Sequence, residues 1–204
     1  MSRLLLVRHG VTEFNSSRRF AGYSDIEMTA AGYEQVERLR DRLANERIDA
    51  VYSSDLKRTL ATAEVICSGR KVEIIPCPEL RECNYGDAEG LTFQEISRRY
   101  PEMAEFIVNF NLRLEFPGGE SFKEFIERTT KFLDRLNKQA PSETILVASH
   151  SGPLRVLICA LLGIDQNHWW QIRVDNASLS IADTYPRGAI ISLLNDTSHL
   201  RKEG

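Results

Sequence analysis

Short runs of consecutive apolar residues alternate along the chain with segments whose apolar residues recur at helical spacing. The first run, LLLV, predicts a buried strand over Arg3–Val7. The runs in DAVYSS, KVEII and TILVAS predict further strands, the first ending near Ser53 and the last at Ser149. Two or three late strands are expected to close the sheet. Because unbroken apolar runs are typical of strands covered on both faces, the pattern favours a mainly parallel sheet.

Helical patterns fill the segments between these strands. Thr29 can cap a helix over Ala30–Asn45, whose inner face is apolar. A second helix, over roughly Leu56–Ile66, brings Arg58 into its first turn. LRVLICALLG predicts a buried helix that ends at Gly163. The alternation of strand and helix predicts an α/β fold of three layers, with a mostly parallel central sheet and helices on both faces.

Two capping boxes mark further helices. TFQE from Thr92 and SFKE from Ser121 each place a hydroxyl and a carboxylate three positions apart, as at helix starts. No repeat, linker or low-complexity stretch divides the chain, which predicts one domain over residues 1–204 with a variable cap-like segment at about 88–120. In and beside that segment, four aromatic residues have roughly helical spacing and are interpreted as core: Phe93, Tyr100, Phe106 and Phe110.

The bulk composition narrows the class of protein. With 204 residues the chain can bury a substantial core, and a net charge of −3 gives no general attraction to nucleic acid or to anionic lipid. No apolar run approaches the ~20 residues of a membrane span, and the start of the chain lacks the pattern of a signal peptide. The four cysteines show no CxxC pair and no metal-site spacing. These observations predict a cytoplasmic protein with reduced structural thiols, and with neither nucleic acid nor membrane as a partner.

Cationic and imidazole side chains follow three of the predicted strands. Arg8 and His9 come directly after the first strand, His150 follows TILVAS, and Arg58 lies shortly after DAVYSS. In α/β sheets, ligands bind beyond the carboxyl ends of the strands, so these residues are expected to meet in one crevice. A single histidine at such a place is more often structural. Two histidines, each at the end of a buried strand, favour a reactive site.

These residue types suit the transfer of a phosphoryl group. An imidazole nitrogen is a nucleophile, and nearby cations lower the pKa of the ring and keep it neutral. Arginine offers forked donors that match phosphate oxygens in a bidentate way. Thr12 and Asn15 supply neutral hydrogen bonds on the same loop, while Gly10 and Gly152 let backbone amides approach an anion.

Other polar residues have either two possible roles or no expected role in catalysis. Arg18 and Arg19 either form a solvated charge pair or reach a second anionic group of a substrate. His9 lacks the further ligands of a metal site. His168, beside two tryptophans, is expected to pack or to face solvent, and His199 is expected to be exposed.

Several motifs, in this order, resemble those of the histidine phosphatase superfamily, also called the phosphoglycerate mutase-like family. LLLVRHGVTEFN resembles its signature, which implies that His9 is the residue that becomes phosphorylated. GYSDIEMTAAG and VYSSDLKRTLATAEVI resemble the next segments, the second of which carries the phosphate-binding Arg58. PELRECNYGDAEG resembles the acid-bearing segment and implies Glu82 as proton donor, and FPGGESFKEFIER and VASHSGPLR resemble the later motifs, with His150 in the last. The resemblance spans nearly the whole chain.

This resemblance implies a two-step hydrolysis without a metal or another cofactor. His9 would attack phosphorus while Glu82 protonates the departing alkoxide, and water activated by Glu82 would then hydrolyse the phosphohistidine. Arg8, Arg58 and His150 would bind the phosphoryl oxygens. Taken without the resemblance, Glu82 is more simply a solvated charge beside Arg81. The implied phosphate-binding set also includes Thr12, Asn15, Gly22, Ser151 and Gly152.

Two features favour a phosphatase over a mutase. The long insertion between the acid and the second histidine, which covers the site in mutases, is absent here. PGGESFKEFIERTTKFL resembles the smaller phosphatases, including α-ribazole phosphatase and metal-independent phosphoserine phosphatase. The leading prediction is a phosphomonoesterase for a small phosphorylated metabolite, such as α-ribazole 5′-phosphate or phosphoserine, with specificity set around Ile96–Leu114. Phosphoglycerate mutase is the alternative, followed by an inactive phosphate-binding module, and a homodimer is left open.

Overall fold

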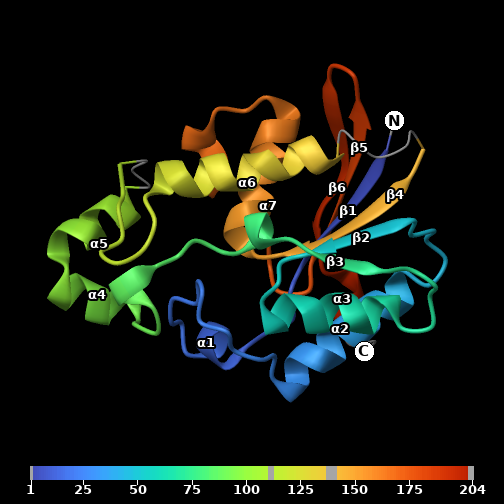
Figure 1. Ribbon diagram of the computed structural model, residues 1–204. Coiled ribbons are helices and arrows are strands. Elements are labelled where there is room, and N and C mark those ends of the chain that lie inside the picture. The colour runs from blue at the N-terminus through green and yellow to red at the C-terminus, as the bar shows by residue number, and fades with distance from the viewer. Residues whose placement is uncertain (1, 110–112, 137–141, 202–204) are drawn as a thin grey trace.

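The computed structural model describes residues 2–109, 113–136 and 142–201, and these contain a central six-stranded sheet (Figure 1). Its order is β3-β2-β4-β1-β5-β6. Strands β1 to β4 pair in parallel, and β5 and β6 are added antiparallel next to β1. The predicted mostly parallel sheet is therefore confirmed. The strands are β1 (Arg3–Arg8), β2 (Ala50–Ser53), β3 (Ile74–Pro76), β4 (Thr144–Ser149), β5 (Leu179–Tyr185) and β6 (Gly188–Asp196).

Helices cover both faces of the sheet, as a three-layer fold requires (Figure 1). On one face lie α2 (Ala30–Arg42) and α3 (Lys57–Cys67), and on the other lie α6 (Phe122–Leu136) and α7 (Ser151–Leu162). Shorter helical segments lie outside these two layers. They include α1 (Glu13–Ser16), η1 (Pro78–Leu80), η2 (Gly86–Ala88), η3 (Gln166–Gln171) and η4 (Ser198–Leu200).

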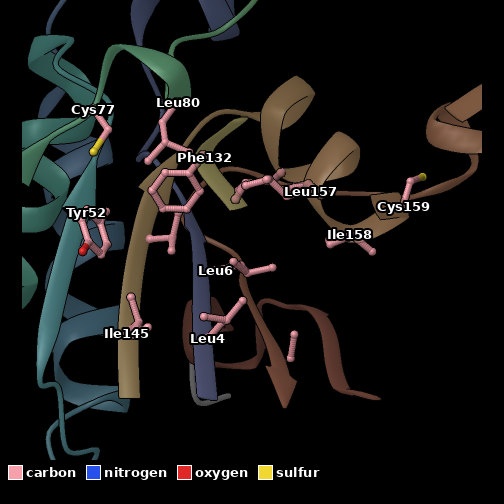
Figure 2. Packing of buried hydrophobic residues seen from close by; sticks show 14 of the residues in the cluster. Leu4, Leu6, Tyr52, Cys77, Leu80, Phe132, Ile145, Leu157, Ile158 and Cys159 are labelled. Carbon is pink, nitrogen blue, oxygen red and sulfur yellow. The ribbon is translucent and has the colours of Figure 1, made fainter. Parts of the chain in front are cut away.

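The side chains of β1 alternate between the two helical layers, because successive residues of a strand point to opposite faces. Leu4 and Leu6 pack with Phe132 of α6, as Figure 2 shows. Leu5 and Val7 pack instead on the side of α2 and α3. A fully buried leucine contributes roughly 1.5–3 kcal/mol relative to an exposed one, so the strand is held from both sides. This explains why the run LLLV is apolar without interruption.

The register of the parallel strands brings the ends of β1, β2 and β4 together. Arg8 of β1 is paired with Ser149 of β4, and the amide of His9 donates to the carbonyl of Ser149 at 3.1 Å. The residue that directly follows each of these two strands is a histidine, so His9 and His150 lie side by side. On the other side of β4, the amide of Ser54 donates to the carbonyl of Ala148 at 2.9 Å. The ends of β1, β2 and β4 thus meet at the edge of the sheet where the crevice was expected.

Two further helices lie beyond this edge of the sheet, α4 (Phe93–Arg99) and α5 (Pro101–Val108) (Figure 1). A third buried apolar cluster, to which Ile96, Phe125 and Val156 belong, joins them to α6 and α7. This cluster lies directly against the strand ends where the two histidines emerge.

Three element boundaries differ from the sequence prediction. The helix predicted over Ala30–Asn45 ends at Arg42. The third strand is shifted to Ile74–Pro76, and it accommodates Pro76 because it lies at the edge of the sheet, where a missing N–H donor is tolerated. The helix in LRVLICALLG begins earlier, at Ser151, and contains Pro153 in its first turn, where the proline N–H would have no partner in any case.

Individual side chains also differ from expectation. Phe93 is 41% exposed rather than core, and Phe110 lies outside the described residues. His199 is half-buried, not exposed, and its Nε2 lies 3.0 Å from the carbonyl oxygen of Ala177.

All four cysteines are buried thiols. Over the parts of the chain that the structure describes, no helix combines the length and apolarity that crossing a membrane would need.

Candidate active site

His9 is a neutral imidazole with one nitrogen available. It is 4% exposed, and its Nδ1 lies 2.8 Å from the carbonyl oxygen of Gly10. A carbonyl can only accept a hydrogen bond, so Nδ1 carries the proton and Nε2 carries the lone pair. Burial, followed by the positive charges of Arg58 and Arg8, lowers the pKa of His9 well below its usual value. At pH 7 the ring is therefore uncharged, which is the state of a nitrogen nucleophile.

His150 faces His9 but has the opposite tautomer. The two ring centres are 5.1 Å apart in an edge-on arrangement. The Nε of Arg58 donates to Nδ1 of His150 at 3.2 Å, so the proton of His150 is on Nε2, which donates to the hydroxyl of Ser54 at 3.0 Å. Burial, then Arg58, lowers the pKa of His150 as well. Sequence reasoning missed Ser54, although its place directly after a strand next to β4 is a usable signal.

The two arginines of the site differ in how many donors they have left. Arg8 donates through Nη1 to the carbonyl of Val174 at 2.8 Å, and its buried Nε has no hydrogen-bond partner within the described residues. Arg58 is fully buried and makes four hydrogen bonds, one to His150 and three to carbonyl oxygens of residues 21, 22 and 24. Burial lowers the pKa of Arg58 to about 10, and the group remains a cation at pH 7. The predicted open fork is therefore available at Arg8, whereas Arg58 mainly adds charge and holds the loop.

Glu82 is a buried carboxyl group held by two backbone donors. It is 7% exposed, so the alternative of a solvated charge is wrong. The amide of Cys83 donates to Oε1 at 3.0 Å, and the amide of Gly152 donates to Oε2 at 3.1 Å. A Cβ at Gly152 would overlap Oε1 of Glu82, so a larger residue there would have to displace this carboxyl group. The amide of Gly152, expected to approach an anion, thus binds Glu82 in this structure.

The loop after β1 contains both lining and supporting residues. Asn15 lines the cleft, and its Oδ1 accepts from both the amide and the hydroxyl of Thr12 and from Nδ2 of Asn176. The side-chain nitrogen of Asn15, Nδ2, makes no hydrogen bond within the described part of the chain, whereas its backbone amide donates to the hydroxyl of Thr12. Thr12 is fully buried as the N-cap of α1 and does not line the cleft. Asn176, which orients Asn15, has no motif around it and was missed.

Gly22 also lies behind the cleft instead of in it. Its amide donates to Glu89 at 3.1 Å and its carbonyl accepts from Arg58. The carboxylate of Glu89 accepts from the amides of Tyr23 and Ser24 too, so it gathers residues 22–24 into one tight loop. The loop and Arg58 together form the floor under the two histidines. Nothing in the local sequence identifies Glu89 as the residue that organises this loop.

The cleft itself is polar and open to solvent. Arg18 and Arg19 lie on its wall, but Arg19 is tied to the carbonyl of Gly90 and to Glu95. Arg18 is exposed and has no such partner among the described residues, so of the two it is better placed to reach a second anionic group. Other residues that line the cleft are Arg8, His9, Asn15, Phe20, Ala21, Glu82, Tyr85 and Ser151. Among the residues described, no three His, Cys, Asp or Glu side chains are grouped in a way that could hold a metal ion.

Comparison with known proteins relates nearly the whole chain to one family. The sequence model of the histidine phosphatase superfamily (branch 1) matches residues 4–197. Phosphoserine phosphatase 1 of Hydrogenobacter thermophilus is 36% identical over 200 residues, which are 98% of this chain and 95% of the relative. The adenosylcobalamin/α-ribazole phosphatase of Escherichia coli is 32% identical over 193 residues, 95% of each chain. The crystal structure of the α-ribazole phosphatase of Shigella flexneri superposes with a TM-score of 0.90 at 31% identity, covering 96% of both chains.

Proposed function

Since the chain belongs to the histidine phosphatase superfamily and is a phosphoric monoester hydrolase, we propose that it works through a phosphohistidine on His9 and without a metal ion. The observation that carries this proposal is the hydrogen bond between Nδ1 of His9 and the carbonyl of Gly10. It leaves Nε2 as the nitrogen with a lone pair in a cleft that also contains Arg8 and Glu82.

In the first step, Nε2 of His9 attacks phosphorus while the bond from phosphorus to the ester oxygen breaks. The proton of the Glu82 carboxyl group passes to the departing oxygen, which leaves as a neutral alcohol. Arg8 binds the equatorial oxygens through its remaining donors, and Arg58 adds positive charge beneath them while its hydrogen bond orients His150. These groups are proposed to stay in place through both steps.

In the second step, water attacks the phosphohistidine. Glu82, now ionised, accepts a proton from this water, the bond between nitrogen and phosphorus breaks, and inorganic phosphate leaves. His9 returns to its neutral form, so the cycle needs no further reagent. Cationic side chains supply the charge that Mg²⁺ supplies in many other phosphoryl transfers, which supports independence from metal.

The substrate is proposed to be a small phosphorylated metabolite. The relatives named for phosphoserine and for α-ribazole phosphate make esters of these two kinds the first candidates. The short connection between Glu82 and His150 supports hydrolysis over mutase activity, because a mutase must keep water away from its phosphoenzyme.

A rapid-quench experiment with a ³²P-labelled phosphomonoester in excess chelator tests the mechanism. Wild type should accumulate label that is stable to base and lost in acid, as expected for phosphohistidine. His9→Ala should show neither label nor turnover, while His168→Ala, which removes a surface imidazole, should retain both. Label on serine or aspartate, or activity lost to chelator and restored by a divalent metal, would contradict the proposal. Transfer of label to 3-phosphoglycerate in place of water would indicate a mutase.

A further inference from the structure

A second, apolar pocket opens beside the proposed proton donor. Its cavity volume is about 100 Å³, several times the roughly 10–15 Å³ that one water molecule needs. Apart from Glu82, none of its lining residues is charged. Its walls come from α5, α6, η3 and the segment before α6, with Phe106, Ile107, Leu114, Phe116, Phe122 and Trp169 among them.

The pocket and the polar cleft adjoin each other. Both are lined by Phe20, Glu82 and Tyr85. The ring of Tyr85 packs edge-on against Phe20 at 5.0 Å and against Phe116 at 5.0 Å, which connects the wall of the cleft to the wall of the pocket. Glu82 is therefore at the junction between them. If Glu82 protonates the oxygen of the departing alcohol, the carbon atoms of that alcohol lie next to this apolar space.

From this geometry we infer that the subsite for the leaving group accepts an apolar alcohol, so that the preferred substrates are phosphomonoesters with an aromatic or alkyl body. The inference rests on the proposed function, because it takes Glu82 as the donor to the leaving oxygen. Seven of the lining side chains are aromatic and belong to Phe, Tyr or Trp, so bulky flat groups can pack on them.

A leaving group with a carboxylate fits this pocket poorly. Burying an ionised group without a partner is strongly unfavourable, and among the residues that the structure describes no cationic side chain lines the space. Two arginines lie behind the wall without being part of the lining: the guanidinium of Arg155 is 5.5 Å from the ring centre of Trp169, and that of Arg128 is 5.4 Å from the ring centre of Phe125. Arg128 is already paired with Glu120 at 2.7 Å. Arg155 is thus the residue to vary if charged substrates are preferred after all.

A series of primary alkyl phosphates isolates this effect, because ethyl, butyl and hexyl phosphate share the same kind of leaving oxygen. With wild type, kcat/KM should rise about three- to fourfold for each methylene that enters the pocket. 3-Phenylpropyl phosphate should be at least as good as hexyl phosphate, and phosphoserine and 3-phosphoglycerate should be poorer than both.

Adjacent residues of α5 provide a matched pair of variants. Ile107 lines the pocket, whereas Val108 is 59% exposed and does not line it. Ile107→Asp should remove most of the preference for hexyl over ethyl phosphate, and Val108→Asp should keep it. Should Ile107→Asp fail to fold, Ile107→Trp gives an apolar test, because a larger side chain should move the optimum to shorter esters.

The outcomes separate this inference from the proposed function. If wild type hydrolyses the whole series at equal kcat/KM, the apolar subsite is wrong while the chemistry stands. If it hydrolyses none of these esters and forms no phosphohistidine, the proposed function itself fails. A preference for phosphoserine that Arg155→Met abolishes would overturn the inference in favour of a charged subsite.

Discussion

His9 and His150 carry the same side chain at equivalent strand ends, yet their neighbours assign them different protons. The carbonyl of Gly10 holds the proton on Nδ1 of His9, and the guanidinium of Arg58 holds it on Nε2 of His150. Both nitrogens of His150 already have protein partners, whereas Nε2 of His9 does not within the described residues. The two histidines are therefore not interchangeable, and these hydrogen bonds support the proposal that His9 is the nucleophile.

The role proposed for Glu82 can be tested by changing the leaving group. An alkyl phosphate leaves as a basic alkoxide and needs a proton in the transition state, whereas nitrophenolate is stable as an anion. Glu82→Gln should slow phosphoenzyme formation from an alkyl phosphate by ~10²–10⁴-fold, and by clearly less with p-nitrophenyl phosphate. Single-turnover kinetics are needed, because Glu82 is also proposed to act in the second step. Equal losses with both esters would indicate that Glu82 only positions other groups.

At the scale of elements, α7 has a glycine at each end for a different physical reason. Gly152, in its first turn, leaves room for the carboxylate of Glu82. Gly163, after its last turn, has a φ of 66°, and a Cβ there would meet no atom within 4 Å. One glycine thus serves the site, and the other serves the backbone of the helix end.

Alanine at each position should separate these two roles. Gly152→Ala should displace Glu82 and slow phosphoenzyme formation from an alkyl phosphate on the order of 10²-fold per folded molecule. Gly163→Ala should leave that rate unchanged and lower the free energy of unfolding by about 1–2 kcal/mol, because alanine is strained at this φ. Single-turnover rates and urea unfolding of both variants measure the two effects. If the rate in Gly152→Ala fell only in proportion to its folded fraction, the contact with Glu82 would not matter for catalysis.

The same helix shows what local sequence can and cannot predict. Helix starts with a capping box were predictable, since Thr92 and Ser121 each bond to a carboxylate three residues later. The start of α7 was missed because the apolar run from which the helix was predicted begins only at Leu154, although proline is accepted in a first turn. The amide of Gly152 was expected to face phosphate, but its partner, Glu82, is 70 positions away in sequence, and the hydrogen bond depends on how the segment after η1 lies against the first turn of α7.

At the scale of the whole molecule, the polar site and the apolar pocket differ in how far they could be predicted. Parallel strands end at one edge of a sheet, so residues that follow strands were expected to meet, and His9 and His150 do so. The apolar pocket has no such rule. Phe106 in α5 and Phe122 in α6 each belong to a helical pattern that is typical of core residues. The space between these side chains results from how α5, α6 and η3 are placed around the pocket. A core face and a pocket wall have the same sequence pattern.

The buried histidines should make the stability of the whole molecule depend on pH. In the unfolded chain a histidine has a pKa of about 6.5, whereas in the fold burial and the charges of Arg8 and Arg58 lower the pKa of His9 and His150. Below pH ~6.5 the unfolded state therefore binds more protons, and the free energy of unfolding should fall by up to about 1.4 kcal/mol per pH unit for each histidine. Half-buried His199, whose pKa is also lowered, acts in the same direction. Urea unfolding at pH 7.5, 6.5 and 5.5 measures the slope, which should shrink in His9→Asn and shrink further in the double variant with His150→Asn. A wild-type stability that is constant over this range would mean that the site accepts charged imidazoles, and His9 would then not be the neutral nucleophile proposed here.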